Sequence, residues 1–244
     1  MLIEGKTALV TGAAGALGNA MVQTLIEGGA KAVIGLDLQQ IEGDKIISAT
    51  CDLSDAAAVE ATLTPLLAEH TVDILINNAG ILHSAPLVNM VSKDTERFAN
   101  AAADWERTIN VNLSSAFYVT QLVADQMAKK RTKGVIVNMS SVSSGGNAGQ
   151  SAYSASKAGI ESLTKVWAKE LSPMGIRSVA IAPGYINTPS THKAVSESQL
   201  AAITDKIPLK RLGEAENILQ AMRFVIENDY VNATTIEVDG GFKP

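Results

Sequence analysis

The stretch Ala8-Leu-Val-Thr-Gly-Ala-Ala-Gly-Ala-Leu-Gly18 decides the fold, because a short apolar run passes directly into a glycine-rich turn. This pattern predicts a strand over 8–10 and a helix that starts in the turn and continues to about Glu27. Glycines let the backbone turn tightly and approach a pyrophosphate, which then lies at the N-terminus of the helix. We therefore expect a dinucleotide to contact Gly12, Gly15, Ala16, Leu17 and Gly18.

Further β-branched and apolar runs follow, separated by longer segments whose apolar residues have helical spacing, for example Met21 and Leu25. Such alternation is typical of a doubly wound α/β fold: a parallel sheet, here of about seven strands, with helices on both faces. We expect residues 1–244 to form one domain. Ligands of such sheets bind beyond the carboxyl ends of the strands. The other expected strands span residues 32–36, 46–49, 74–76, 135–139, 178–182 and 234–238.

The composition limits the function classes. Of the 244 residues 46% are hydrophobic and 18% are charged, which suits one well-packed α/β domain. The formal net charge of −5 argues against nucleic acid or an anionic membrane as a partner. A single cysteine, the lack of a signal segment and the lack of an 18-residue apolar stretch predict a soluble cytoplasmic protein. No metal-ligand spacing occurs, so we expect no metal.

An acidic residue closes the second expected strand. Asp37 follows Gly12 by 25 residues, which is the place where a carboxylate accepts hydrogen bonds from an adenosine ribose and repels a 2′-phosphate. No lysine or arginine lies in the glycine loop or directly after Asp37. The sequence thus favours NAD over NADP. The alternative is that Asp37 is only a solvated carboxylate at a strand end.

Two later strand ends offer further cofactor contacts. Cys51-Asp52-Leu53 follows the third strand and provides a carboxylate for an adenine amino group. Asn77-Asn-Ala-Gly80 follows the fourth strand and forms a small turn that suits contact with a ribose. We expect the cofactor to contact Asp52, Leu53, Asn78, Ala79 and Gly80, although a plain turn is the alternative for 77–80.

The candidate catalytic pair is Tyr153 and Lys157, which lie four residues apart and one turn apart on one face of an expected helix over 152–171. The pKa of a free tyrosine is about 10, and a nearby cation favours the phenolate and lowers that pKa. The pair therefore predicts an acid–base device. Ser140 and Ser141 end the expected strand over 135–139 and can reach the same oxygen. The alternative is a Ser/Gly-rich loop beside an ordinary helix.

The sequence also makes predictions for three further segments. A long helix is expected over 104–130, and on spacing alone Asn112 near its middle is expected to face solvent. Segment 82–103 is longer than a simple connection from strand to helix needs and is expected to form a flap or a short helix near the pocket. The polar stretch after Pro183-Gly184 predicts a substrate lid around 187–206.

Together these motifs, in this order, resemble the short-chain dehydrogenase/reductase family over nearly the whole chain, ending in Val238-Asp-Gly-Gly241. The resemblance implies a Rossmann fold and an NAD-dependent oxidoreductase. It implies that Tyr153 is the general acid/base, that Lys157 lowers its pKa and holds the nicotinamide ribose, and that Asn112 anchors a proton-relay water. The strand-end serine would polarise the substrate carbonyl. The cofactor would also contact Tyr153, Lys157, Pro183, Gly184, Ile186 and Thr188.

Two positions depart from the family pattern. Ala16 stands where the middle glycine of the loop is usual, and we expect binding to survive the added methyl group. The family's serine commonly lies 13 residues before the tyrosine, which is Ser140 here, whereas Ser141 lies at 12. We choose Ser141, because the second serine of such a pair usually takes the role, and leave Ser140 open.

The closest resemblance within the family is to short-chain 3-hydroxyacyl-CoA dehydrogenases and 3-oxoacyl thioester reductases. It implies a 3-hydroxyacyl/3-oxoacyl thioester as substrate and a homotetramer or dimer. One alternative is a dehydrogenase of a small hydrophobic or cyclic alcohol, of steroid or terpenoid type. An alternative of another class is a non-catalytic NAD-binding regulator.

Overall fold

The computed structural model describes residues 1–88 and 102–244, and its centre is a parallel sheet with the strand order β3-β2-β1-β4-β5-β6-β7. Every neighbouring pair of strands is parallel. This confirms the predicted doubly wound sheet of seven strands. The strands span Thr7–Thr11 (β1), Ala32–Asp37 (β2), Ile46–Thr50 (β3), Ile74–Asn77 (β4), Val135–Met139 (β5), Arg177–Pro183 (β6) and Thr235–Val238 (β7).

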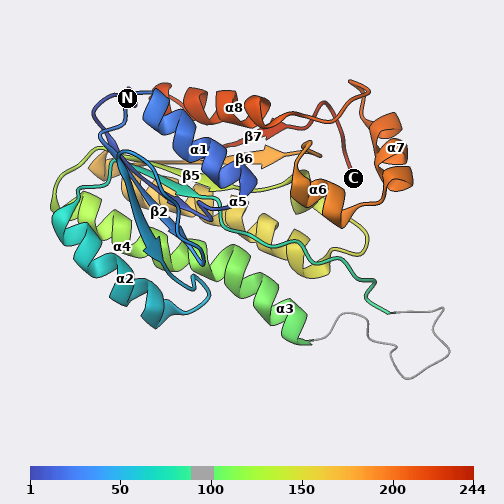
Figure 1. The fold of residues 1–244 in the computed structure, drawn as a ribbon, viewed down its shortest axis with the longest axis horizontal. Coiled ribbons are helices and arrows are strands. Elements are labelled where there is room, and N and C mark those ends of the chain that lie inside the picture. Colours follow the sequence, from blue (N-terminus) through green and yellow to red (C-terminus); the bar gives the residue numbers. More distant parts are fainter. Residues whose placement is uncertain (89–101) are drawn as a thin grey trace.

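The core lies on both faces of the sheet because successive strand side chains point to opposite sides. Val10 packs with α1 (Ala16–Glu27) and α8 (Ala215–Glu227) on one face. Leu9 packs on the other face against α2, α4 and α5. Figure 1 shows α1 and α8 above the sheet and α2 and α4 below it. The bounds of the three helices on this second face are Ala56–Glu69 for α2, Ser115–Lys129 for α4 and Ser151–Leu171 for α5.

The helix expected over 104–130 is interrupted. Helix α3 (Ala102–Ile109) runs into a π-helical turn over Asn110–Ser114, and α4 continues from there. Single π-helical turns inside α-helices are frequent at functional sites. Of the expected flap over 82–103, residues 89–101 lie outside the described part of the chain.

The predicted lid contains two short helices, α6 (Pro189–Ala194) and α7 (Glu197–Lys206). Figure 1 shows both beyond the carboxyl end of β6, on the side where ligands of such sheets bind. Short 3₁₀ turns follow β5 (Val142–Gly145) and α5 (Ser172–Met174). Among the described residues, no helix combines the length and apolar character needed to cross a bilayer.

The glycine loop is tied to the end of β4 by its backbone. Gly12 has a φ of +66°, and a Cβ atom there would lie 2.9 Å from the Cα of Ala79. The Asn78 side-chain nitrogen donates to the carbonyls of Thr11 (3.0 Å) and Gly12 (3.2 Å). A Cβ on Gly18 would lie 2.0 Å from the Gly12 carbonyl oxygen. The two strand ends therefore approach so closely that only glycine fits at these two positions.

We predict that Gly18→Ala lowers the free energy of unfolding by about 2–3 kcal/mol, because the methyl group must push the backbone apart. For a chain of this length that change lowers the melting temperature by roughly 5–10 °C. The matched control is Gly15→Ala, since a Cβ on the exposed Gly15 meets only the Gly12 carbonyl oxygen, at 3.3 Å. Thermal unfolding measures both variants, and equal melting temperatures would contradict the prediction.

Candidate active site

A cleft of about 680 Å³ opens at the carboxyl ends of the strands, and most of the predicted site residues line it. A cavity of this size is typical of small-molecule and cofactor sites. It is framed by the glycine loop, the ends of β4, β5 and β6, the start of α5 and the start of α6. The predicted residues on its wall are Ala16, Leu17, Asn78, Gly80, Ser141, Tyr153, Lys157, Pro183, Gly184, Ile186 and Thr188.

The Asp37 carboxylate lies beside the glycine loop. It accepts hydrogen bonds from the backbone nitrogens of Ala14 (3.0 Å) and Gln39 (3.3 Å). The carboxylate at this strand end is thus bonded to the backbone of the loop as well as partly exposed to solvent. These two bonds hold a negative charge beside the loop that is expected to bind the phosphates, and they leave lone pairs free for ribose hydroxyls.

The side chains of Asp52 and Leu53, the two cofactor contacts predicted after β3, have different surroundings. The Asp52 carboxylate accepts from the backbone nitrogen and the hydroxyl of Ser54, at 2.9 and 2.7 Å, and these bonds hold its pKa below the usual range. Leu53 is buried in the core on the α2 side of the sheet. Asp52 can still accept from an adenine amino group, whereas the Leu53 side chain takes part in packing.

Asn112 is buried in the π-helical turn, only 2% exposed, so the expectation that it faces solvent is wrong. Its side-chain oxygen accepts from the Ile81 backbone nitrogen (2.8 Å), and its nitrogen donates to the Ile81 carbonyl (2.9 Å) and approaches the Ser156 hydroxyl (3.3 Å). Asn112 therefore holds the segment after Gly80 against α5.

The ammonium of Lys157 is buried, at 4% exposure, and donates to the Met139 carbonyl at 2.7 Å. Burial lowers its pKa from 10.5 to about 8. The nitrogen lies 5.7 Å from the centre of the Tyr153 ring. Lys157 thus places one positive charge against the end of β5 and beside the Tyr153 ring.

The pKa of Tyr153 differs from the expectation. Burial raises the pKa of this phenol, and a side-chain hydrogen bond with Ser141 opposes the rise. The sequence predicted a lowered pKa because it placed a cation next to the hydroxyl, whereas the ammonium is directed at Met139. At neutral pH Tyr153 is therefore a phenol that can donate a proton.

The two serines at the end of β5 have different surroundings. The Ser140 hydroxyl donates to the Glu161 carboxylate at 2.8 Å and lies 3.3 Å from the Lys157 carbonyl, so it ties β5 to α5. The Ser141 hydroxyl accepts from the Ser143 backbone nitrogen (3.2 Å) and bonds with Tyr153. This geometry fits the choice of Ser141. Sequence reasoning missed Glu161, although its place four residues after Lys157 was a usable signal.

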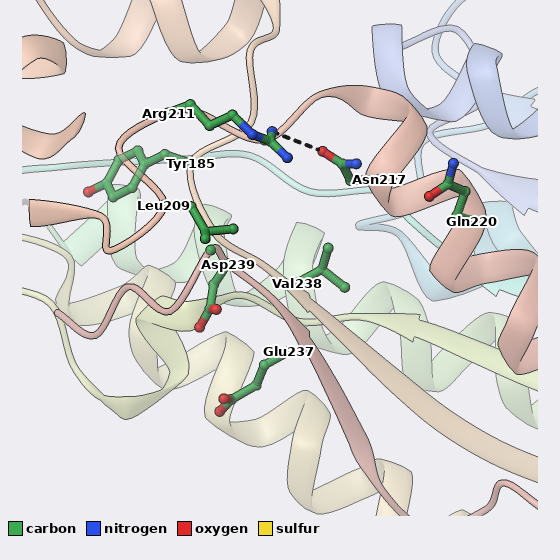
Figure 2. Close-up of a pocket in the computed structure, with 10 residues that line it drawn as sticks. Tyr185, Leu209, Arg211, Asn217, Gln220, Glu237, Val238 and Asp239 are labelled. Atoms are coloured by element: carbon green, nitrogen blue, oxygen red, sulfur yellow. Dashed lines mark hydrogen bonds between the residues drawn. The ribbon is translucent and has the colours of Figure 1, made fainter. Parts of the chain in front are cut away.

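A second hollow, of about 330 Å³, lies between β7, the start of α8 and the segment that precedes α8. Figure 2 shows Arg211 directed at Asn217, while Glu237 and Asp239 extend to the other side. Its charges are already paired: Arg211 donates to the Leu212 carbonyl (3.0 Å), and Lys243 contacts both acids. The ring of Tyr185 borders this hollow and packs at 87° on Phe242. The candidate acid–base pair lies elsewhere, in the larger cleft.

The depressed pKa of Lys157 predicts a pH-dependent stability. Between about pH 8 and 10.5 the unfolded chain binds more protons at this lysine than the folded chain, so folding stability rises with pH in that window. The total rise is about 3 kcal/mol. Lys157→Met should remove it, whereas Lys165→Met, at an exposed position of the same helix, should keep it. Denaturant unfolding at pH 7.5 and 10.5 measures the difference, and parallel curves for all three proteins would refute the role of burial.

Comparison with known proteins agrees with this geometry. The family model described as short chain dehydrogenase matches residues 6–199. The 3-oxoacyl-[acyl-carrier-protein] reductases of Thermotoga maritima and Salmonella typhimurium are 38% and 39% identical; each match covers 99% of this chain, and 99% and 98% of the relatives. A solved 4-hydroxyisoleucine dehydrogenase complexed with NADH superposes with a TM-score of 0.87 at 27% identity, over 97% of this chain and 98% of that one. The chain belongs to the short-chain dehydrogenase family of oxidoreductases.

Proposed function

We propose that the protein is an NAD-dependent reductase of 3-oxoacyl thioesters, acting through Tyr153, Ser141 and Lys157. The observation that carries the proposal is the junction of β5 and α5, where Ser141, Tyr153 and the buried Lys157 ammonium line the same wall of a cofactor-sized cleft. The two 3-oxoacyl reductases named above, whose matches cover 99% of this chain, support the substrate class.

The cleft fits a nicotinamide dinucleotide. Gly12 and Gly18 leave no room for a side chain where the glycine loop meets the end of β4, and Ala16 and Leu17 of the same loop line the cleft. When bound, the nicotinamide supplies the hydride that turns the ketone into an alcohol. Gly12, Gly15, Ala16, Leu17 and Gly18 would hold its phosphates. The exposed Ala16 methyl group fits this arrangement.

Side chains of the protein supply the proton for the substrate oxygen and stabilise the charge that develops there. Tyr153 donates its proton to the carbonyl oxygen of the substrate, which completes the alcohol. The raised pKa of Tyr153 suits this direction, since the donor is protonated at neutral pH. Ser141 donates a hydrogen bond to the same oxygen. Acid catalysis contributes roughly 10²–10⁴-fold and one such donor about 10²–10³-fold. Lys157 supplies positive charge beside the phenol that loses its proton.

The preference for NAD rests on Asp37. Its carboxylate is held beside the glycine loop by the Ala14 and Gln39 backbone nitrogens, and it would repel a 2′-phosphate. The glycine loop, including Gly15, contains no lysine or arginine, so it brings no positive charge that could bind such a phosphate. The solved relative described with NADH supports the same choice.

We also infer assembly into a homodimer or homotetramer. Phe117 on α4 and Val166 on α5 are 43% and 41% exposed, which leaves apolar surface on the faces of both helices. Light scattering on the purified protein measures the number of copies, and a monomer at micromolar concentration would contradict the inference.

The proposed function is tested by NADH oxidation with acetoacetyl-CoA, with a cyclic ketone and with a plain aliphatic ketone, each repeated with NADPH. We expect acetoacetyl-CoA and NADH to give the highest kcat/KM. A preference for the cyclic ketone would favour the alternative alcohol dehydrogenase. NADH binding without turnover of any carbonyl would favour the non-catalytic regulator, and a preference for NADPH would overturn the role of Asp37.

Variants locate the chemistry in the same assay. Tyr153→Phe and Ser141→Ala should each lower kcat by at least about 100-fold while NADH still binds, because each removes a group that acts on the reacting oxygen. Ser140→Ala is the matched control, since its hydroxyl bonds to Glu161. If Ser140→Ala loses as much kcat as Ser141→Ala, the assignment of the catalytic serine is wrong.

A further inference from the structure

Beyond Tyr153 and Ser141 the cleft continues into a side cavity of about 120 Å³, which we call the alcove. Ser141, Tyr153 and Gly184 line both the cleft and the alcove, so a substrate whose carbonyl lies against Tyr153 reaches into it. The remaining wall includes Gln150 and Tyr185. A cavity of about 150 Å³ holds one benzene ring, so the alcove takes only a short group.

The Gln150 side chain makes no hydrogen bond with the described residues that would explain a glutamine at this position. Gln150 stands at the N-cap of α5, where Ser, Thr, Asp or Asn usually accept from the first turn, and its side chain makes no capping hydrogen bond. Its Oε1 atom is buried and has no hydrogen-bond partner among the described residues. Buried polar atoms are almost always paired, because an unpaired one loses its bonds to water without replacement. This amide therefore calls for a ligand.

We propose that the Gln150 amide binds the second oxygen of the substrate, the thioester carbonyl of a 3-oxoacyl thioester, and so makes the enzyme selective for it over a plain ketone. This rests on the function proposed above. The oxygen and nitrogen of a glutamine amide are told apart only by the hydrogen bonds they make, and among the described residues Oε1 has no partner that would fix the orientation of this amide. A half-turn of the amide places an N–H donor where Oε1 now lies.

The lining of the alcove restricts the group further. None of the described residues on its wall is charged. A free carboxylate would lie there without a cation, which is costly, whereas a neutral carbonyl needs only one donor. The alcove thus fits a thioester and not a 3-oxo acid. Because the alcove holds only a few atoms, the carrier arm of the thioester leaves through the wider cleft.

The test compares kcat/KM for acetoacetyl-CoA and for 2-pentanone, which lacks the second carbonyl. Gln150→Met keeps the volume and removes the hydrogen bond, so kcat/KM for acetoacetyl-CoA should fall about tenfold while that for 2-pentanone stays within about twofold. Gln150→Glu should lose as much or more, since a carboxylate cannot donate. Gln23→Met, at an exposed position of α1, is the control and should change neither.

The outcomes separate this inference from the proposed function. If the wild-type enzyme reduces acetoacetyl-CoA and both Gln150 variants do so equally well, the inference is wrong and the function stands. Equal losses with both substrates mean that Gln150 only supports the fold, which also overturns the inference. If the wild-type enzyme reduces 2-pentanone but not acetoacetyl-CoA, the proposed substrate class is wrong and the inference falls with it. Thermal unfolding and NADH fluorescence confirm that each variant is folded.

Discussion

The arrangement of the site depends on one buried cation. The Lys157 ammonium donates to the Met139 carbonyl, which joins the first third of α5 to the last residue of β5. A charged donor makes a strong bond to a carbonyl in a dry environment. The Ser140 hydroxyl adds a second link to the same helix through Glu161. The lysine bond holds the end of β5, and with it Ser141, against the helix that carries Tyr153, although the two residues are twelve positions and a 3₁₀ turn apart in the chain.

The parallel sheet explains why such distant residues meet. All its carboxyl ends lie at one edge, and the chain leaves β1 toward β3 before it returns to β4 on the other side of β1. The crevice opens at that point. At this point the Asn78 side-chain nitrogen donates hydrogen bonds to the carbonyls of Thr11 and Gly12 and so joins the end of β4 to the glycine loop. Hydrogen bonds between backbone groups and a few amides, more than charge pairs, therefore set the shape of the cleft.

Much of this was predictable from sequence because the signals are local. Strands buried on both faces read as apolar runs, so β5 was predicted to the residue, and the order of strand-end motifs placed the cleft. The failures concern side chains whose partners lie far away in the chain. Asn112 was predicted to face solvent because its partner Ile81 lies 31 residues earlier. The pKa of Tyr153 was predicted in the wrong direction because spacing gives the distance to a cation but not the cost of burial. Gln150 carries no motif at all.

Tyr185 forms a wall shared by the alcove and the hollow of Figure 2, and its ring is supported from behind by Phe242. The space available to a substrate is therefore set in part by a residue that never faces it. Attempts to widen the substrate range of this enzyme by redesign can begin with Phe242, where a smaller side chain gives the Tyr185 ring room to move without altering the candidate acid–base residues.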